Sequence, residues 1–295
     1  MMKRFVFSIF LLPLLLASPQ TKAQGIMLTP KWTAQAQFTG YYVADKLGFY
    51  KEEGIDVCVQ HPAISESSFS FMEKGRAPVV IMNLSYAFME RLAGARVVNV
   101  MQTSQENSLM LISHSPLKGE ESLRNQKIAV WNHLSQKLLD RLAEHYALKQ
   151  VEWIRFNSGV NVFLSGAADP CLVGSYNEYL QLSEYGMNVD SIYSIRLADY
   201  GYNLPEDGLY VTEEFYNQYP EVVRKLVKAS MRGWAWTNEH REEALDMVME
   251  EVKKGNIGTN RYHQRKMLEE VLRLQVDQQS GQRTCLLYTS PSPRD

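Results

Sequence analysis

The segment Gly174-Ser-Tyr-Asn-Glu178 combines residue types that can hold a small planar molecule. A carboxylate such as Glu178 can accept two parallel N–H bonds, and the ring of Tyr176 can stack against a flat ligand or fill the space beside it. The same residues are also typical of a helix start, with Asn177 as the cap and Glu178 favouring the helix dipole. Residue types alone therefore leave ligand recognition and helix capping both open.

Trp32 can contribute in a different way, because an indole at a strand-to-helix turn offers a flat face for stacking. Its alternative is a core position beneath the first helix. Ser65 begins a serine-rich helix start, where free backbone N–H groups suit an anion, although a serine there is equally an N-cap. The candidate ligand-binding residues are Trp32, Thr33, Ser65, Asn83, Trp131, Tyr176, Asn177, Glu178 and Tyr200.

Residues for catalysis or metal binding form no recognisable pattern in the sequence. Cys58 and Cys171 are isolated, and the six histidines show no metal-ligand spacing. The sequence also shows no nucleophile elbow, phosphate loop or carboxylate dyad. We therefore expect no enzymatic activity, no metal and no cofactor. We expect both cysteines to be small buried residues at strand ends, without a disulfide.

Composition indicates an exported globular protein. Residues 1–23 have a basic start at Lys3 and Arg4, an apolar run over 5–17 and small residues before Gln24, which is the layout of a cleaved signal peptide. The apolar run is too short to span a bilayer, and no cysteine follows it to carry a lipid anchor. The formal net charge is −2 with interspersed signs, which argues against a nucleic-acid partner. We therefore expect a periplasmic location.

Alternating strands and helices must position the candidate residues. Apolar runs typical of strands cover 26–28, 55–59, 79–82, 97–101, 109–112, 128–131, 152–156, 170–173 and 209–211. Helical periodicity covers 41–50, 66–73, 86–92, 135–146, 160–164 and 178–183, and the last part, 213–276, is helical throughout. Such alternation predicts parallel sheets covered by helices, with ligands beyond the carboxyl ends of the strands.

We divide the chain into two α/β lobes joined by crossing segments. Lobe one takes residues 24–112 and 208–284, and lobe two takes 113–207, with hinges within 103–112 and 194–210. A ligand site is then expected between the lobes. Residues 285–295 resemble a translated sequencing adapter, so we treat them as an artefactual tail outside the fold.

Three motifs near the start of the chain carry a family resemblance. They are Trp32-Thr, Gly40-Tyr-Tyr-Val-Ala44 and Gly48-Phe-Tyr-Lys-Glu-Glu-Gly-Ile-Asp-Val57. Together they resemble the opening of periplasmic substrate-binding proteins of ABC importers, in the branch related to thiamine-pyrimidine synthases. That branch also includes binders of pyrimidine precursors, sulfonates and nitrate. The sequence departs from the family pattern at Phe38, where the family has a histidine, and at Ala34-Gln35, where it has Pro-Asn.

The resemblance implies a two-lobed periplasmic-binding-protein fold of type II, with parallel-rich sheets flanked by helices and a ligand cleft between the lobes. It implies that the protein, as a monomer, delivers a small planar solute to an ABC permease and its ATPase. The solute expected is a thiamine-related pyrimidine, whose edge would donate to Glu178 while Trp32 lines the cleft.

Three alternatives remain beside this expectation. The first is a sulfonate or other anion binder of the same fold, using the serines at 65–68. The second is a thiamine-pyrimidine biosynthetic enzyme, against which the missing histidine and the missing cysteine-rich motif both argue. The third is an exported sensor without a transport role.

Overall fold

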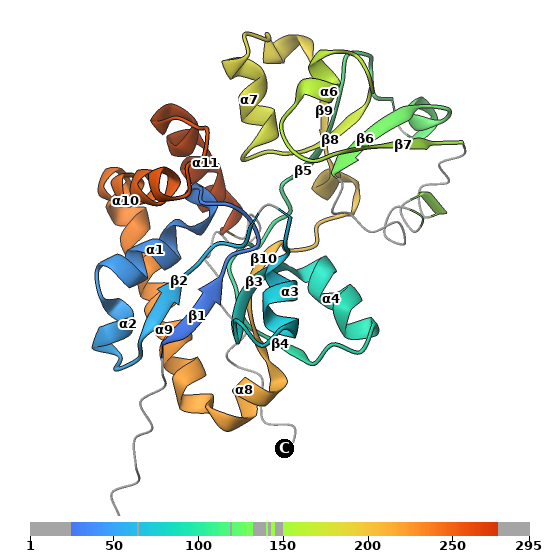
Figure 1. Cartoon of the computed structure of the whole chain (residues 1–295). Coiled ribbons are helices and arrows are strands. Elements are labelled where there is room, and N and C mark those ends of the chain that lie inside the picture. The colour runs from blue at the N-terminus through green and yellow to red at the C-terminus, as the bar shows by residue number, and fades with distance from the viewer. Residues whose placement is uncertain are drawn as a thin grey trace, which may run out of the picture.

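The computed structural model describes residues 25–63, 65–118, 120–131, 140, 143–144 and 150–276, which form two lobes around two five-stranded sheets (Figure 1). The α/β class expected from the sequence is therefore confirmed. The predicted signal peptide 1–23, most of the predicted helix 135–146 and the predicted tail 285–295 lie outside the described residues. Within the described ranges, no helix is both long and apolar enough to cross a membrane.

The first sheet has the strand order β2-β1-β3-β10-β4. Its strands are β1 (Ile26–Thr29), β2 (Val57–Val59), β3 (Val79–Asn83), β4 (Val97–Gln102) and β10 (Asp207–Thr212). The pairs β1–β2 and β1–β3 are parallel, whereas β10 runs antiparallel to both β3 and β4. Because β10 is reversed, its first residue lies at the edge of the sheet where β1 and β3 end.

Helices cover both faces of the first sheet (Figure 1). The helices of this lobe are η1 (Ala36–Phe38), α1 (Thr39–Lys46), α2 (Phe49–Glu52), α3 (Ser68–Glu73), α4 (Leu84–Leu92), α8 (Glu213–Gln218), α9 (Pro220–Glu239), α10 (Arg241–Lys254) and α11 (Arg261–Leu274). Val79 and Ile81 of β3 pack with α1, α9, α10 and α11, while Val80 and Met82 pack with α3 and α4. This alternation follows the two-residue period of a strand.

The contact between α1 and α9 depends on two glycines. A Cβ built on Gly233 would lie 2.0 Å from the carbonyl oxygen of Gly40, and one on Gly40 would overlap the Trp234 ring. Any larger residue at either position would force the helices apart. The indole of Trp234 can therefore lie edge-on against Tyr41 in the core, with ring centroids 5.8 Å apart.

The second sheet has the strand order β7-β6-β8-β5-β9. Its strands are β5 (Leu109–Ser113), β6 (Lys127–Trp131), β7 (Glu152–Phe156), β8 (Cys171–Gly174) and β9 (Tyr193–Arg196). The accompanying helices are short: η2 (Glu120–Leu123), α6 (Asn161–Leu164), α7 (Glu178–Glu184), η3 (Val189–Ser191) and η4 (Leu197–Tyr200). A separate core, which includes Ile112, Phe163 and Leu182, lies around this sheet.

The position of β5 corrects one predicted boundary. The strand Leu109–Ser113 pairs with β8 and β9 in the second sheet, so the chain changes lobes before Leu109, whereas lobe one was expected to extend to residue 112. An apolar run indicates a strand but not the sheet that it joins. The second crossing lies between β9 and β10, inside the predicted hinge 194–210.

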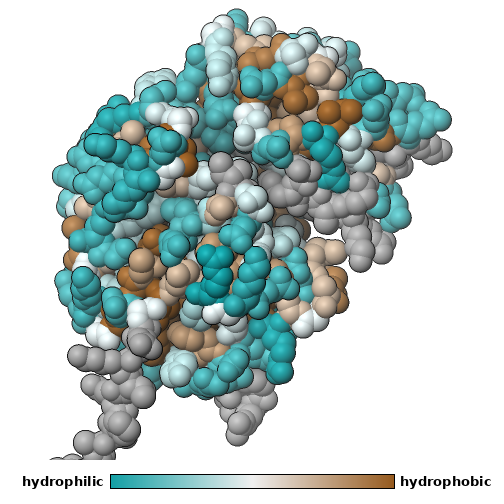
Figure 2. Space-filling view, in the orientation of Figure 1, coloured by the Kyte–Doolittle hydropathy of each residue, from teal (hydrophilic) through white to brown (hydrophobic). Residues whose placement is uncertain are grey.

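Cys58 and Cys171 differ in environment. Both are free thiols, and Cys171 is buried as expected, but Cys58 is exposed. The prediction for Cys58 was wrong because β2 is an edge strand that presents one face to solvent. The face of the molecule shown in Figure 2 is mostly hydrophilic, with apolar residues in small separated patches.

Candidate functional site

Glu178 is a buried carboxylate at the start of α7, with only 6% of its surface exposed. Its Oε1 accepts hydrogen bonds from Trp131 Nε1 at 3.3 Å and from Asn177 Nδ2 at 3.0 Å, and its Oε2 accepts from the backbone N–H of Gly174 at 3.1 Å. A Cβ on Gly174 would lie 3.3 Å from Oε2, so the glycine lets the carboxylate fold back over the end of β8. Strand end, turn and helix start together fix this group.

Asn177 does not cap α7 with its side chain. Its amide instead donates to Glu178 and accepts from Gln181 Nε2 at 3.3 Å. The capping interpretation of this segment is therefore wrong for Asn177. The amide serves to hold the carboxylate of Glu178.

Two opposing effects act on the ionisation of Glu178. Burial raises the pKa of the Glu178 carboxyl, while hydrogen bonds from its own backbone N–H and from Gly174, Trp131 and Asn177 act to lower it. A carboxylate has about four acceptor positions, which matches these four donors, and all four donors are neutral.

Tyr176 connects the second lobe with the first. Its ring packs against the core of the first lobe, and its hydroxyl accepts a hydrogen bond from Gln37 Nε2 at 3.1 Å. Burial raises the pKa of Tyr176 well above its ordinary value, and the charges of Glu206, Asp207 and Glu178 raise it further. The hydroxyl is thus a neutral group among three carboxylates.

Two of these carboxylates, Glu206 and Asp207, were not among the predicted site residues. Glu206 accepts from the hydroxyl of Ser108 at 2.9 Å and from the Ser108 N–H at 3.1 Å. Burial raises the pKa of Glu206, and the nearby charge of Lys31 opposes that shift. Glu206 directly precedes β10 and Asp207 is its first residue, in the segment that the sequence indicated only as a hinge.

Asp207 forms an ion pair with Lys31. Its Oδ1 lies 2.6 Å from Lys31 Nζ, and its Oδ2 accepts from Gln37 Nε2 at 2.6 Å. Lys31 Nζ also donates to Asn83 Oδ1 at 2.5 Å. Lys31 directly follows Pro30 at the end of β1, so the rule that ligand sites lie at strand ends could have found it.

These residues form one arrangement between the lobes, which we call the inter-lobe polar cluster. Its members are Lys31, Gln37, Asn83, Ser108, Trp131, Tyr176, Asn177, Glu178, Glu206 and Asp207. The structure therefore brings together five predicted site residues, namely Asn83, Trp131, Tyr176, Asn177 and Glu178. The cluster offers three carboxylates and one lysine, so it favours ligands that bring N–H donors.

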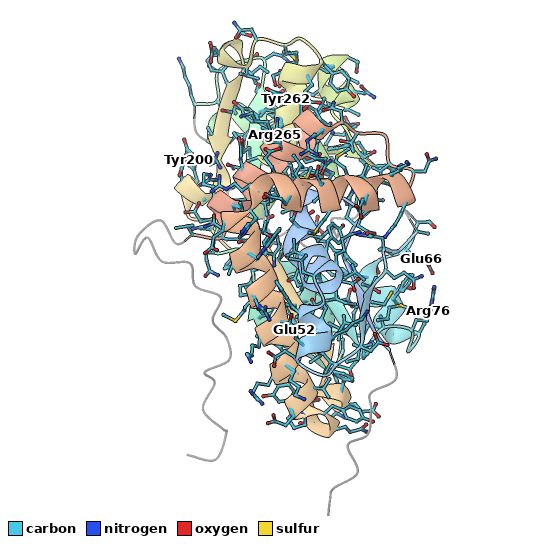
Figure 3. The ribbon with its side chains drawn as sticks, turned by 90° about the vertical axis from the view of Figure 1, so that its left-hand side faces the viewer. Glu52, Glu66, Arg76, Tyr200, Tyr262 and Arg265 are labelled. Atoms are coloured by element: carbon cyan, nitrogen blue, oxygen red, sulfur yellow. The ribbon has the colours of Figure 1, made fainter. Side chains whose placement is uncertain are left out.

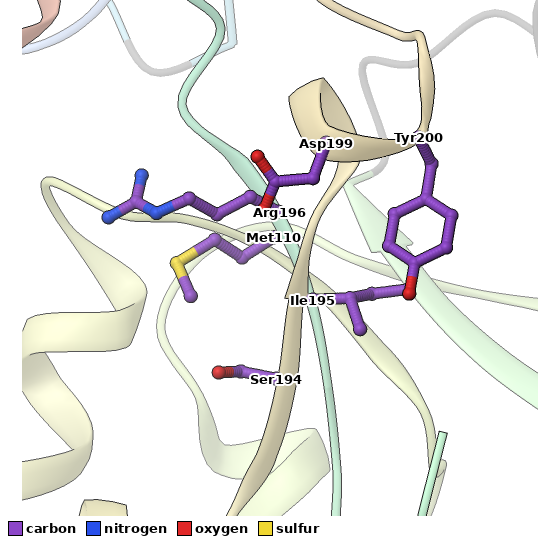
Figure 4. A pocket seen from close by; sticks show the side chains of 6 residues that line it. All are labelled: Met110, Ser194, Ile195, Arg196, Asp199 and Tyr200. Carbon is purple, nitrogen blue, oxygen red and sulfur yellow. The ribbon is translucent and has the colours of Figure 1, made fainter. Parts of the chain in front are cut away.

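The other four predicted residues are not among the members of this cluster. Trp32 is half-buried against the first-lobe core, and its carbonyl oxygen is 2.5 Å from His61 Nδ1; Thr33 is half-buried in the same turn. Ser65 is exposed ahead of α3. Tyr200 is 53% exposed and borders an open hollow of about 510 Å³ beside β9. In Figure 4 the Tyr200 ring points to one side of β9, and Arg196, Met110 and Ser194 point to the other.

Metal binding has no candidate in the described part of the chain, where no three His, Cys, Asp or Glu side chains are grouped to hold an ion. The inter-lobe polar cluster itself offers hydrogen-bonding groups and charges.

The two lobes, each with a helix-covered sheet, define the periplasmic-binding-protein fold. The crystal structure of the periplasmic aliphatic sulphonate binding protein SsuA from Escherichia coli matches with a TM-score of 0.65 and 14% identity over 83% of each chain. The type expected from the sequence is thereby confirmed.

The chain belongs to the NMT1/THI5-like family, whose model matches residues 35–244. It is 29% identical to the riboflavin-binding protein RibY of Chloroflexus aurantiacus, over 86% of this chain and 73% of that protein. It is 23% identical to the formylaminopyrimidine-binding protein of Halalkalibacterium halodurans, over 86% of this chain and 81% of that protein. Further relatives are named 4-amino-5-hydroxymethyl-2-methylpyrimidine phosphate synthases.

Proposed function

We propose that this protein is an extracytoplasmic solute-binding protein that delivers a thiamine-related aminopyrimidine to an ABC permease. The observation that carries the proposal is the buried Glu178 carboxylate, which is held in place between Trp131 and Gly174 by neutral donors alone. An aminopyrimidine edge presents N–H donors in a plane, and a fixed carboxylate is their natural acceptor. The similarity to a formylaminopyrimidine-binding protein supports the same ligand class.

The charge of the inter-lobe polar cluster favours this ligand over a sulfonate. Glu178, Glu206 and Asp207 contribute acidic groups, while Lys31 is already bonded to Asp207 and Asn83. An anion placed here would approach carboxylates in a poorly hydrated environment, which is unfavourable.

Two of the three serines proposed for anion binding have structural roles. Ser67 caps α3 by accepting a hydrogen bond from the Ser70 N–H, and the Ser68 hydroxyl donates to the carbonyl oxygen of Ile81. Ser65 is exposed. The likeness to SsuA concerns the fold alone, so the sulfonate alternative has little support from these residues.

An enzymatic role is also disfavoured, although the family includes enzymes. Phe38, where the family has a histidine, is fully buried in the first-lobe core. The nearby His61 has both ring nitrogens engaged, with Trp32 O at 2.5 Å and Tyr42 OH at 2.7 Å, and burial lowers its pKa. We propose that the chain binds its solute without converting it.

The proposal is tested by thermal unfolding with a ligand panel. The probes are 4-amino-5-hydroxymethyl-2-methylpyrimidine, a formylaminopyrimidine, riboflavin and an alkanesulfonate. A ligand at about 100 times its Kd stabilises the folded state by about 2.7 kcal/mol. We expect the pyrimidines to raise the melting temperature and the sulfonate to leave it unchanged. Stabilisation by the sulfonate alone would overturn the proposal, and stabilisation by riboflavin alone would replace the pyrimidine with a flavin.

A further inference from the structure

Glu270 is a first-lobe acid that is bonded to the second lobe. It belongs to α11, and its side chain is 16% exposed. Its Oε1 accepts a hydrogen bond from the Ser175 hydroxyl at 2.5 Å and lies 3.5 Å from the guanidinium of Arg196. Arg273, three residues further along α11, donates to Oε1 at 2.9 Å and to Oε2 at 2.7 Å. One carboxylate of the first lobe therefore contacts two residues of the second.

The two second-lobe partners of Glu270 lie at important points of the chain. Ser175 directly follows β8 and begins the turn at residues 175–178, which ends with the candidate recognition residue Glu178. Arg196 is the last residue of β9, so it lies where the second crossing between the lobes begins. The acid is therefore bonded both to the candidate site and to a crossing segment.

The end of α11 is also bonded to the first crossing, which connects β4 with β5. The backbone N–H groups of Gln105 and Glu106 donate to the carbonyl oxygen of Leu274 at 2.8 and 3.2 Å. Arg273 Nη1 donates to Glu106 Oε2 at 3.2 Å. Through Arg273, the acid is thus connected to the first crossing as well as to the second.

Cationic partners keep the Glu270 carboxyl ionised. Burial acts to raise the pKa of Glu270, but hydrogen bonds from Arg273 and Ser175 and the charges of Arg273 and Arg196 together lower it below the ordinary glutamate value. The bond from the Ser175 hydroxyl is therefore charge-assisted. Such bonds are shorter and stronger than those between neutral groups, in agreement with the distance of 2.5 Å.

The same face of α11 makes a second contact with the second lobe. His263 lies two turns before the acid, and residues seven positions apart share a helix face. Its Nδ1 lies 2.7 Å from Glu184 Oε1, and its Nε2 lies 3.0 Å from Asn177 Oδ1. Figure 3 shows α11, with Arg265 labelled, at the level where the lobes meet, and Glu52 far below it. The helix thus provides part of the first-lobe surface that the second lobe contacts.

We infer that Glu270 is a positioning residue for the ligand site, a charged anchor that holds the turn of Glu178 against the first-lobe part of the inter-lobe polar cluster. The inference rests on the proposed function, in which Glu178 accepts from the ligand. Lys31, Gln37 and Asp207 of the cluster belong to the first lobe, so a ligand that contacts both parts needs the lobes at a fixed separation. The anchor consists of the protein's own groups, and it therefore lowers the conformational cost that the ligand would otherwise meet.

The local fold of Ser175 does not depend on this bond. The backbone N–H of Ser175 donates to the carbonyl oxygen of Ser108 at 2.9 Å, and the preceding strand β8 is paired with β5. The hydroxyl therefore adds a contact between the lobes rather than a contact within the turn. A variant without the hydroxyl should keep the turn and lose only the anchor.

The test uses three variants of the full chain, Ser175→Ala, Glu270→Gln and Glu269→Gln. The first removes the bond between the lobes and leaves the pair of Arg273 with the acid in place. The second keeps the size of the side chain and removes its charge. The third is the matched control, because it removes an exposed pair with Lys266 on the same helix.

Small-angle X-ray scattering measures the separation of the lobes without added ligand. We expect a larger radius of gyration for Ser175→Ala and Glu270→Gln than for the wild type, and the wild-type value for Glu269→Gln. Saturating 4-amino-5-hydroxymethyl-2-methylpyrimidine should return the first two variants to the wild-type value, because the ligand then adds contacts that favour the closed arrangement. Wild-type dimensions in both variants without ligand would overturn the inference.

Calorimetry with the same pyrimidine measures the effect on binding. Affinity should fall about 10-fold in Ser175→Ala and about 10- to 100-fold in Glu270→Gln. The double variant should bind no more weakly than Glu270→Gln alone, since both changes remove the same bond. Lower stability with unchanged affinity in both variants would indicate a purely structural role, which would overturn the inference and leave the proposed function intact.

If the wild type binds no pyrimidine, the proposed function fails separately. The scattering comparison without ligand then decides whether Glu270 anchors the second lobe. A larger radius of gyration in Ser175→Ala supports the anchor, and an unchanged one overturns it.

Discussion

Asp207 and Glu178 are both buried acids between the lobes, but they are satisfied in different ways. Asp207 has a lysine at 2.6 Å and an amide donor, so its charge is largely neutralised within the first lobe. Glu178 accepts from an indole, an amide and two backbone N–H groups, all of which are neutral. A carboxylate bonded only to neutral donors keeps its negative charge available, whereas an ion-paired one does not. The comparison favours a structural role for Asp207, and it is the basis on which we propose Glu178 as the acid that recognises the ligand.

The largest expected effect comes from breaking the ion pair. Lys31→Met keeps the length of the side chain but leaves Asp207 buried without a cation, which typically destabilises a protein by about 3–5 kcal/mol. Urea unfolding of the variant measures this loss. As a control, Lys74→Ala removes an exposed pair with Glu66 and should cost about 1 kcal/mol or less. A loss for Lys31→Met as small as that control would show that Asp207 does not need its partner.

The next effect concerns affinity. Glu178→Gln keeps size and shape but places an NH₂ group opposite the donors, so pyrimidine binding should weaken by about 1.5–3 kcal/mol, or roughly 10- to 150-fold. Binding of a sulfonate should strengthen, because a repelling charge is lost. Calorimetry with one ligand of each kind measures both changes, and Glu52→Gln, far from the cluster, is the matched control. Equal pyrimidine affinity in variant and wild type would remove Glu178 from the site.

A smaller effect is expected in the pH dependence of stability. Burial raises the pKa of Glu206, so the folded state binds this proton more tightly than the unfolded state does. The stability contributed by the proton is complete below the ordinary glutamate pKa and is lost as the pH rises through the raised folded-state value. The unfolding free energy of the wild type minus that of Glu206→Gln should therefore fall with rising pH.

Glu242 provides the opposite case for the same measurement. Hydrogen bonds from Arg265 and Arg261 lower the pKa of Glu242 to about 2, so its contribution is present above the ordinary glutamate pKa and is lost as the pH falls towards 2. The difference between the wild type and Glu242→Gln should thus rise with pH. Slopes of the same sign for both variants would contradict the assignment of Glu206 as a buried acid.

Glu178 and Asp207 also show how much of the candidate site the sequence can predict. Strand ends and helix starts are visible in the sequence, and they identified Asn83, Trp131 and Glu178, which the fold brings together. Asp207 was missed because β10 is antiparallel to β3. The start of β10, rather than its end, therefore lies beside the end of β3. The contacts of His263 with Glu184 and Asn177 could not be predicted, because these partners lie 79 and 86 residues away on the other lobe. Periodicity predicts which face of a helix is buried, but not which polar group it meets there.

The smallest expected effect tests whether the serines at 65–68 of the first lobe take part in ligand binding. Ser67→Ala removes the cap of α3 and should cost about 1 kcal/mol of stability, whereas Ser65→Ala, at an exposed position, should stay within about 0.5 kcal/mol. Neither variant should alter binding of an alkanesulfonate or a pyrimidine in calorimetry, because Glu178, the acid proposed to recognise the ligand, is on the other lobe. A drop in sulfonate affinity for Ser65→Ala would instead locate an anion site at this loop. Glu178 would then no longer be the residue that selects the ligand.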